Sequence, residues 1–198
     1  GAARSDTTCL KSSLPGTGAS RMAGEGSLHG IRVLEIAQGV SGPYTGKLLA
    51  GLGAEVLKVE PSGGDEARRE GPFPGDVPDV ERSGLFLHLN TGKRSCTLNL
   101  ACKDGQGLLG RLLTVGKFDV LILGHRPAEL EALGLDPAIL VRDNPSLIVV
   151  NVSPFGLTGP RRNWLGTELI VYAASGYMSL TGSAEREPIK SYGHLIEY

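Results

Sequence analysis

Short apolar runs alternate with segments of helical spacing along most of the chain. The runs Arg32–Ile36 and Ala54–Val59 are typical of buried strands, and a gap of helix length separates them. Two similar runs follow at Phe118–Leu123 and Ser146–Ser153. Because strands that alternate with helices pack as parallel layers, the pattern predicts an α/β fold with a Rossmann-like, doubly wound and mostly parallel sheet.

The helical segments are marked by apolar residues three and four positions apart or by an initial proline. We expect helices at Asp104–Val115, directly after Pro127, at Pro137–Asp143 and at Thr167–Ser179. In the last of these the apolar residues are expected to face inward; they are Leu169, Ile170, Ala173 and Ala174.

A basic turn, Thr91–Arg94, separates two short segments without helical spacing. These segments, Leu85–Asn90 and Ser95–Leu100, are predicted to be extended. The chain between Pro61 and Gly84 is rich in glycine, proline and charge and is too long for an ordinary connection. We interpret it as a functional loop, and a solvated surface loop is the alternative.

The turn between the first strand and the first helix is the leading candidate for a ligand site. Ligands of parallel sheets bind beyond the carboxyl ends of the strands, which is where Gly39–Pro43 lies. Its two glycines permit close approach of the backbone, and Pro43 suits a first helical position. The turn reads G-x-x-G-P rather than G-x-G-x-x-G, which argues against a dinucleotide site.

Composition and charge narrow the class of protein. The 198 residues are 40% hydrophobic and 21% charged, and 20 basic against 21 acidic residues give a net charge of −1. We therefore expect no nucleic-acid and no membrane partner. Three cysteines without C-x-x-C spacing indicate neither a disulfide framework nor a metal site, so a reducing, cytoplasmic location is favoured.

Residues 1–29 differ in composition from the rest, being rich in glycine, alanine, serine and threonine. We interpret them as a disordered tail. A remnant of an organelle leader, with a mitochondrial location, is the alternative, because basic residues outnumber acidic ones there. Residues 30–198 are predicted to form one domain.

Six motifs follow one another along residues 30–198. They are VLEIAQGVSGPYTGKLLAGLGAEVLKVEP, SGGDEAR, LNTGKRSCTLNL, GHRPAELEALGLD, NPSLIVVNVSPFGLTGP and TELIVYAASGYMSLTG. Together they resemble the N-terminal half of the class III CoA-transferases of CaiB/BaiF type, the family of formyl-CoA and L-carnitine CoA-transferases and α-methylacyl-CoA racemases. The resemblance implies a Rossmann-like domain that binds coenzyme A, truncated relative to a family whose members form homodimers of interlocked chains.

The resemblance also implies a reaction. Transferases of this family move CoA from an acyl-CoA thioester to a free carboxylic acid, without a metal, through an aspartate that attacks the thioester. The motif G-H-L-I-E puts Glu197 at that place. Since glutamate carries its carboxylate on a longer arm, a non-catalytic acyl-CoA-binding or assembly module remains an alternative.

Glu168 falls where relatives carry a second acidic residue, which in the racemases belongs to an acid/base pair. The helix dipole is the other explanation, because it favours an acidic residue in a first helical turn. The racemases pair this acid with a histidine just before Asn-Pro, and Val141–Asp143 contains none. This departure counts against an acyl-CoA racemase, which stays the third interpretation.

For coenzyme A itself, Lys93 and Arg94 are the candidate cations for the phosphates, followed by Arg126. His125 replaces an aromatic residue of the family and is suited to stack on adenine, with an ordinary surface histidine as the alternative. The predicted binding site comprises Val40, Ser41, Gly42, Pro43, Asp65, Arg68, Lys93, Arg94, Gly124, His125 and Arg126.

Overall fold

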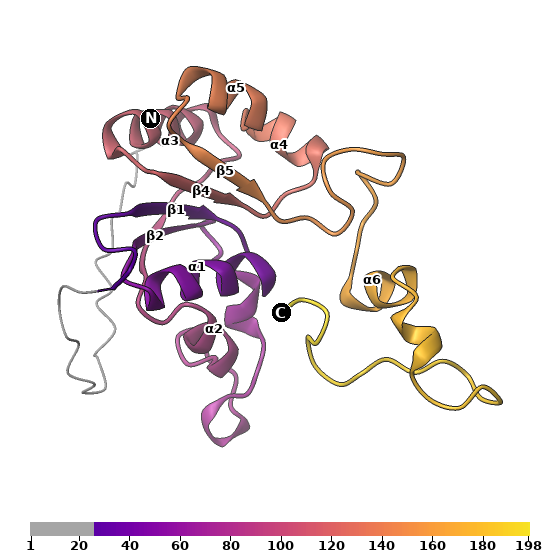
Figure 1. Ribbon diagram of the computed structural model, residues 1–198. Helices are drawn as coiled ribbons and strands as arrows, with labels where there is room; N and C mark the ends of the chain where they lie inside the picture. The colour runs from indigo at the N-terminus through magenta and orange to yellow at the C-terminus, as the bar shows by residue number, and fades with distance from the viewer. Residues whose placement is uncertain (1–25) are drawn as a thin grey trace, which may run out of the picture.

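A five-stranded sheet forms the centre of the computed structural model, which describes residues 26–198 (Figure 1). The strand order is β3-β2-β1-β4-β5, and every pair is parallel. The strands are β1 (Arg32–Ile36), β2 (Glu55–Glu60), β3 (Arg94–Thr97), β4 (Val120–Leu123) and β5 (Ile148–Asn151). The predicted α/β, doubly wound architecture is confirmed, and the sheet is entirely parallel.

The central strand β1 fixes the register of the sheet. Leu34 lies opposite Leu57 of β2 on one side and Leu121 of β4 on the other. Leu34 and Leu121 are completely buried, as parallel strands covered on both faces should be. The order reverses direction at β1, which creates a topological switch point between β1 and β4.

Helices cover both faces of the sheet (Figure 1). On one face lies α1 (Ser41–Gly51), with α2 (Gly84–Leu89) packed beyond it, and on the other lie α3 (Lys103–Gly116), α4 (Pro127–Leu133) and α5 (Pro137–Asp143). Leu109 of α3 and Leu130 of α4 belong to the same buried cluster as Leu34, whereas Ala50 of α1 packs in a second cluster with Val33.

The prediction of an extended segment at Leu85–Asn90 is wrong, because these residues form most of α2. The Ser83 hydroxyl accepts a hydrogen bond of 3.1 Å from the Phe86 amide and so caps the helix. Phe86 and Leu89, three residues apart, are then buried on one side. A short apolar run is compatible with the residue spacing of a strand and with that of a helix. Here the capping serine favours the helix. Of the second predicted segment, β3 covers only the first part.

The loop between Pro61 and Gly84 contains two short 3₁₀ helices, η1 (Glu66–Arg69) and η2 (Pro74–Asp76). Asp65 caps the first of these by accepting a hydrogen bond of 2.9 Å from the Ala67 amide. The loop is therefore partly ordered by its own side chains and packs Ala67 against Val40 and Phe86.

The helix after β5 is shorter than predicted, and the face that it buries is a different one. Helix α6 (Glu168–Ala174) ends before Ser179 because Gly176 has a φ of 81°, and a 3₁₀ helix, η3 (Tyr177–Leu180), follows. Leu169 and Ile170 are 51% and 41% exposed, so the expected inward face is wrong. Tyr172 is the residue of α6 that is buried.

The predicted tail or leader, residues 1–29, lies mostly outside the described residues. Residues 26–29 are described and form a turn in which the Leu28 amide donates a hydrogen bond of 3.0 Å to the carbonyl of Leu52. Across residues 26–198 no helix is both long enough and apolar enough to cross a membrane.

Candidate functional site

An open pocket of about 390 Å³ lies at the carboxyl ends of β1, β4 and β5. Residues 38–42 supply its wall after β1, Gly124 its wall after β4, and residues 152–154 its wall after β5. Glu66, Gly166, Val171, Ile196 and Glu197 complete the lining. The pocket thus occupies the topological switch point, where open parallel sheets bind ligands.

The turn at the start of α1 supplies backbone donors to this pocket. Gly39 has a φ of 74°, a conformation that side chains disfavour, and its amide donates a hydrogen bond of 3.2 Å to Asp65. The first amides of a helix have no partner within the helix, so those of Ser41 and Gly42 are available beside the pocket. Val40 is buried beneath them, and Pro43 is the third helical residue rather than the first.

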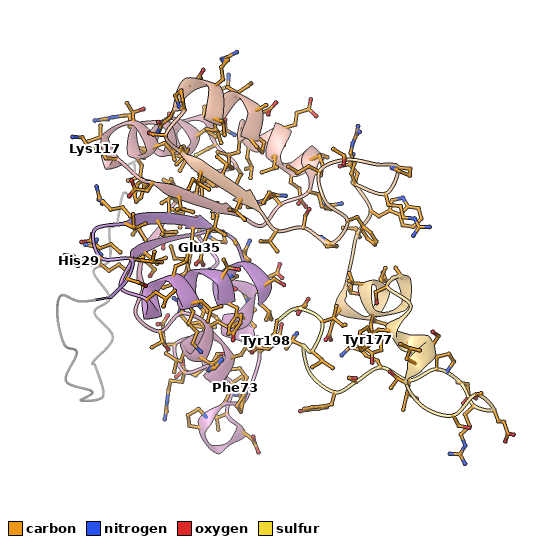
Figure 2. All side chains as sticks on the ribbon, viewed as in Figure 1. His29, Glu35, Phe73, Lys117, Tyr177 and Tyr198 are labelled. Atoms are coloured by element: carbon orange, nitrogen blue, oxygen red, sulfur yellow. The ribbon has the colours of Figure 1, made fainter. Side chains whose placement is uncertain are left out.

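Glu197 is brought to this turn from the far end of the sequence. The Ser41 hydroxyl donates a hydrogen bond of 2.6 Å to the Glu197 carbonyl, and both residues line the pocket. Tyr198, which follows, lies beside α1 (Figure 2), and its ring packs edge-on against Tyr44 with ring centroids 4.9 Å apart. The predicted nucleophile and the predicted thioester turn therefore share one site.

The Glu197 carboxylate contacts a histidine that the sequence interpretation did not include. His194 Nδ1 lies 2.7 Å from Glu197 Oε2, and His194 Nε2 lies 3.0 Å from Glu70 Oε2. Burial acts to lower the pKa of His194, but Glu197 and Glu70 outweigh it and the net pKa is raised. A histidine three residues before the predicted nucleophile was the signal available in the sequence.

Glu168 lies close to the same segment without lining the pocket. Its carboxylate accepts a hydrogen bond of 3.3 Å from the Ile196 amide and pairs with the ammonium of Lys190. Lys190 in turn donates a hydrogen bond of 2.7 Å to the carbonyl of Gly193. These contacts hold residues 190–196 in place, directly before Glu197.

A network of buried charges supports the turn from below. Lys58 contacts Glu35 Oε1 at 2.9 Å and Asp65 Oδ2 at 2.7 Å, and Lys93 contacts Glu35 Oε2 at 2.7 Å. Glu35, in the middle of the sheet, is completely buried (Figure 2). Gly46 of α1 is needed above it, because a Cβ at that position would lie 1.9 Å from Glu35 Oε2.

The two lysines of this network respond differently to burial. Burial acts to lower the pKa of Lys58, but the carboxylates of Glu35 and Asp65 outweigh it and the net pKa is raised. For Lys93 burial prevails over the attraction of Glu35 and lowers the pKa to about 8. Lys58 has two carboxylates for one ammonium, whereas Lys93 shares Glu35 with Lys58.

The other predicted cations are placed away from the pocket. Lys93 donates to the carbonyl of Pro43 at 2.7 Å as well as to Glu35, so its ammonium is enclosed. Arg94 begins β3 and lies 3.4 Å from Glu55 in solvent, at the amino end of the sheet. Arg68 makes two hydrogen bonds to Glu60, of 2.7 and 3.0 Å.

A second, smaller pocket of about 210 Å³ lies on the other side of the same sheet edge. His125 lines it, and its buried Nδ1 has no hydrogen-bond partner, while burial lowers the pKa of this histidine. Arg126 follows but is held by Glu129 and by the carbonyl of Asn163 at 3.1 Å. The remaining lining is mainly apolar, with the amide side chains of Gln38 and Asn99.

The structure therefore groups the predicted residues into three sets. Val40, Ser41, Gly42, Gly124 and Glu197 line the larger pocket, and His125 lines the smaller one. Asp65, Arg68 and Lys93 act in the ion-pair scaffold, whereas Arg94 lies at the opposite end of its strand. Within residues 26–198 no group of three or more potential ligands is placed to hold a metal ion.

Comparison with known proteins identifies similar sequences over nearly the whole described part. The sequence model described as CoA-transferase family III matches residues 28–198. The chain is 40% identical over 167 residues to a succinate–glutarate CoA-transferase from Agrobacterium fabrum, which covers 83% of this chain and 41% of that protein. It is 35% identical over 170 residues to an acetyl-CoA:oxalate CoA-transferase from Acetobacter aceti, covering 85% and 42%.

Solved structures agree with this likeness. A crystal structure of Rv3272 from Mycobacterium tuberculosis has a TM-score of 0.75 at 35% identity and covers 87% of this chain and 47% of its own. A CaiB/BaiF family protein from Brucella suis has a TM-score of 0.76 at 34% identity, with coverage of 87% and 45%. The chain thus spans less than half the length of these relatives.

Proposed function

The chain belongs to CoA-transferase family III, and from this premise we propose that it transfers CoA between an acyl-CoA thioester and a free carboxylic acid with Glu197 as the nucleophile. The observation that carries the proposal is the meeting of Glu197 with the start of α1 in one pocket. Glu197 and the first amides of α1 line the same pocket, and the chemistry needs both a carboxylate and free amides, because the amides stabilise the oxyanion that forms on attack.

The proposed reaction has two exchanges on the protein. Glu197 attacks the thioester carbonyl and the C–S bond breaks. The CoA thiolate departs, and a mixed anhydride between Glu197 and the donor acyl group remains. The thiolate then attacks the glutamyl carbonyl, which releases the donor acid and leaves a glutamyl-CoA thioester. The acceptor carboxylate then attacks the glutamyl-CoA thioester, which expels the CoA thiolate and forms a second mixed anhydride. The thiolate attacks the acceptor's acyl carbonyl, so that the new acyl-CoA is released and the Glu197 carboxylate is restored.

The two pockets support a path for coenzyme A across the sheet edge. Gln38 lines both of them, Gly124 lines the larger pocket and His125 the smaller. We place the thioester in the larger pocket and the adenine beside His125, whose ring offers a stacking surface within apolar walls. Arg126, which directly follows His125, is the cation that we assign to the phosphates, and binding them requires it to give up its ion pair with Glu129.

Glu168 contributes to this function through the segment that it holds. Its carboxylate is occupied by the Ile196 amide and by Lys190, so we assign it to positioning Glu197 rather than to proton transfer. This assignment favours the transferase over the racemase interpretation.

The direct test is the trapping of the glutamyl intermediate. The 198-residue chain is incubated with succinyl-CoA, quenched with hydroxylamine and digested, and a hydroxamate is sought on Glu197 by tandem mass spectrometry. We expect the hydroxamate in the unaltered chain, its absence in Glu197→Gln, and its presence on the new residue in Glu197→Asp. Formation of glutaryl-CoA or oxalyl-CoA after addition of the free acid completes the assay.

Two outcomes would favour the alternatives. Saturable binding of acyl-CoA with no hydroxamate and no new thioester would identify a non-catalytic binding module. Incorporation of solvent deuterium at the α-carbon of a branched acyl-CoA would identify a racemase.

We further propose that the active form is a homodimer. Large apolar side chains of the segment after β5 are exposed; they include Leu165, Leu169, Ile170, Leu180 and Ile189. Exposed apolar side chains gathered in one segment favour association. Light scattering during size-exclusion chromatography measures the mass directly, and a monomer at all accessible concentrations would contradict the proposal for this chain.

A further inference from the structure

A histidine clamp joins the end of the chain to the loop after β2. We define it as His194 together with Glu197 and Glu70, because one imidazole bridges the two carboxylates at 2.7 Å and 3.0 Å. His194 and Glu197 belong to the same terminal segment, whereas Glu70 directly follows η1. The contact between His194 and Glu70 therefore spans 124 residues of sequence.

The protonation state of the imidazole decides whether both contacts can exist. An ionised carboxylate accepts hydrogen bonds but cannot donate them, and a neutral imidazole has only one N–H. Two ionised carboxylates can be bound at once only by the imidazolium, in which both ring nitrogens donate. The raised pKa of His194 agrees with this geometry.

The clamp engages only one oxygen of Glu197. His194 holds Oε2, and among the described residues no hydrogen bond or ion pair engages Oε1. Glu197 also lines the pocket beside Ser41. The carboxylate is thus restrained through one oxygen while the other stays available.

We propose that His194 is a positioning residue that holds the long arm of Glu197 through Oε2 and Glu70, so that Oε1 is the atom that attacks the thioester. The proposal rests on the transferase function proposed above. During attack Oε1 bonds to the acyl carbon and the C–S bond breaks, while the imidazolium keeps its proton. These contacts restrict the side chain of Glu197. Without them, the extra methylene of glutamate would allow the attacking oxygen a wider range of positions than the reaction tolerates.

The charged surroundings determine how the clamp responds to pH. Glu197 and Glu70 face the imidazole directly, Glu66 lines the same pocket, and Lys190 binds the carbonyl of Gly193 while paired with Glu168. Because the pKa of His194 is raised, the clamp is complete below the ordinary value near 6.5 and is lost as pH rises through the higher folded value. Acylation should therefore fall over that interval.

The experiment combines a structural and a chemical measurement on the same variants. NMR titration of the histidine ring protons gives the pKa of His194, which is assigned by the signal missing in His194→Gln. Hydroxamate formation on Glu197 is measured across the same pH range. Glu70→Gln, at a half-exposed position, tests the clamp with little risk to folding, and His29→Gln, at an exposed position far from the pocket, is the matched control (Figure 2).

We expect Glu70→Gln to lower the pKa of His194 and to move the midpoint of acylation downward by the same amount. His194→Ala should slow acylation roughly tenfold to a hundredfold, the order expected for a misplaced reacting group, and should abolish the pH step. His29→Gln should change neither quantity.

Two results would overturn the proposal. A pKa of His194 that is unaffected by Glu70→Gln and by Glu197→Gln would show that the clamp does not form. A midpoint of acylation that stays fixed while the pKa of His194 moves would show that the clamp does not position the nucleophile. Absence of hydroxamate at every pH instead refutes the transferase function, and the titration then still decides whether the clamp exists.

Discussion

The sheet with its covering helices, residues 26–156, and the segment that follows it, residues 157–198, are built by different means. In the first region apolar side chains are enclosed between layers, with Leu34, Leu121 and Leu123 completely buried. In the second, all of which is described, Tyr172 is the only buried residue. The first region therefore owes its structure to a core, whereas the second depends on a few polar and aromatic contacts with its neighbours.

Ion pairs show the same contrast. Lys58 and Glu35 are almost fully enclosed in the sheet, whereas Lys190 and Glu168, in the terminal segment, keep partial access to water. Both pairs support the candidate site, one from beneath the Gly39 turn and one from beside Glu197. The Gly39 turn is therefore supported by the buried interior of the fold. Glu197 is held by partly exposed contacts, which can be broken without unfolding the sheet.

The largest expected effect is the loss of the buried lysine. Lys58→Met leaves Asp65 without its ammonium partner inside the protein, and breaking a buried pair in this way costs about 3–5 kcal/mol. Lys190→Met removes a partly exposed pair and should cost about 0–1 kcal/mol. Urea denaturation followed by circular dichroism measures both, and equal losses would contradict the distinction between the regions.

A second pair of variants compares the apolar side chains directly. Leu121→Ala creates a cavity in the centre of the sheet and should lower the free energy of unfolding by about 2–5 kcal/mol. Leu180→Ala changes a side chain that is 80% exposed and should alter it by less than about 0.5 kcal/mol in the monomer. A large loss in Leu180→Ala would indicate that a partner or a second copy buries this side chain in solution.

The sequence predicted the first region well because its signals are local. The run at Arg32–Ile36 is a strand, the run at Phe118–Leu123 contains the strand Val120–Leu123, and the Gly39–Pro43 turn lies at the carboxyl edge as expected. The second region shows where local signals end. The spacing of Leu169 and Ile170 marks an apolar face, but spacing does not tell what covers that face, and in this chain both residues are exposed.

The candidate site could be predicted only in part. Lys93 and Arg94 look equivalent in a basic turn, yet one is enclosed under α1 and the other lies in solvent, because neighbouring residues at the start of a strand point in opposite directions. The pairing of Glu35 with Lys58 depends on strand register, which the sequence does not specify. The contact of His194 with Glu70 depends on the return of the terminal segment to the loop after β2.

Lys93 offers a way to examine the buried network by pH. The unfolded chain keeps the proton of this lysine up to a pKa near 10.5, whereas the folded chain releases it at about 8. Between these values the unfolded state binds more protons, so the contribution of Lys93 makes the free energy of unfolding rise with pH. Below about 8 both states are protonated, and the folded state carries the full cost of burying the ammonium.

The measurement compares urea denaturation of the unaltered chain and of Lys93→Met on both sides of pH 8. The free energy of unfolding of the unaltered chain, relative to that of Lys93→Met, should increase as pH rises above about 8. Lys103→Met, at an exposed position at the start of α3, serves as the control for general effects of alkaline pH. A constant difference between Lys93→Met and the unaltered chain would show that Lys93 holds its proton in the fold.

The smallest effect concerns the hydrogen bond between Ser41 and Glu197, one of the contacts that join the two regions. Ser41→Ala removes the donor to the Glu197 carbonyl and should cost about 0.5–1.5 kcal/mol of local, not global, stability. Thr45→Val removes a hydroxyl that bonds only within α1 and is the matched control. Because the core does not depend on this contact, amide exchange and proteolysis after β5 should accelerate in Ser41→Ala alone, while the urea midpoint of the sheet stays unchanged. A shift of that midpoint would mean that the terminal segment and the sheet unfold together.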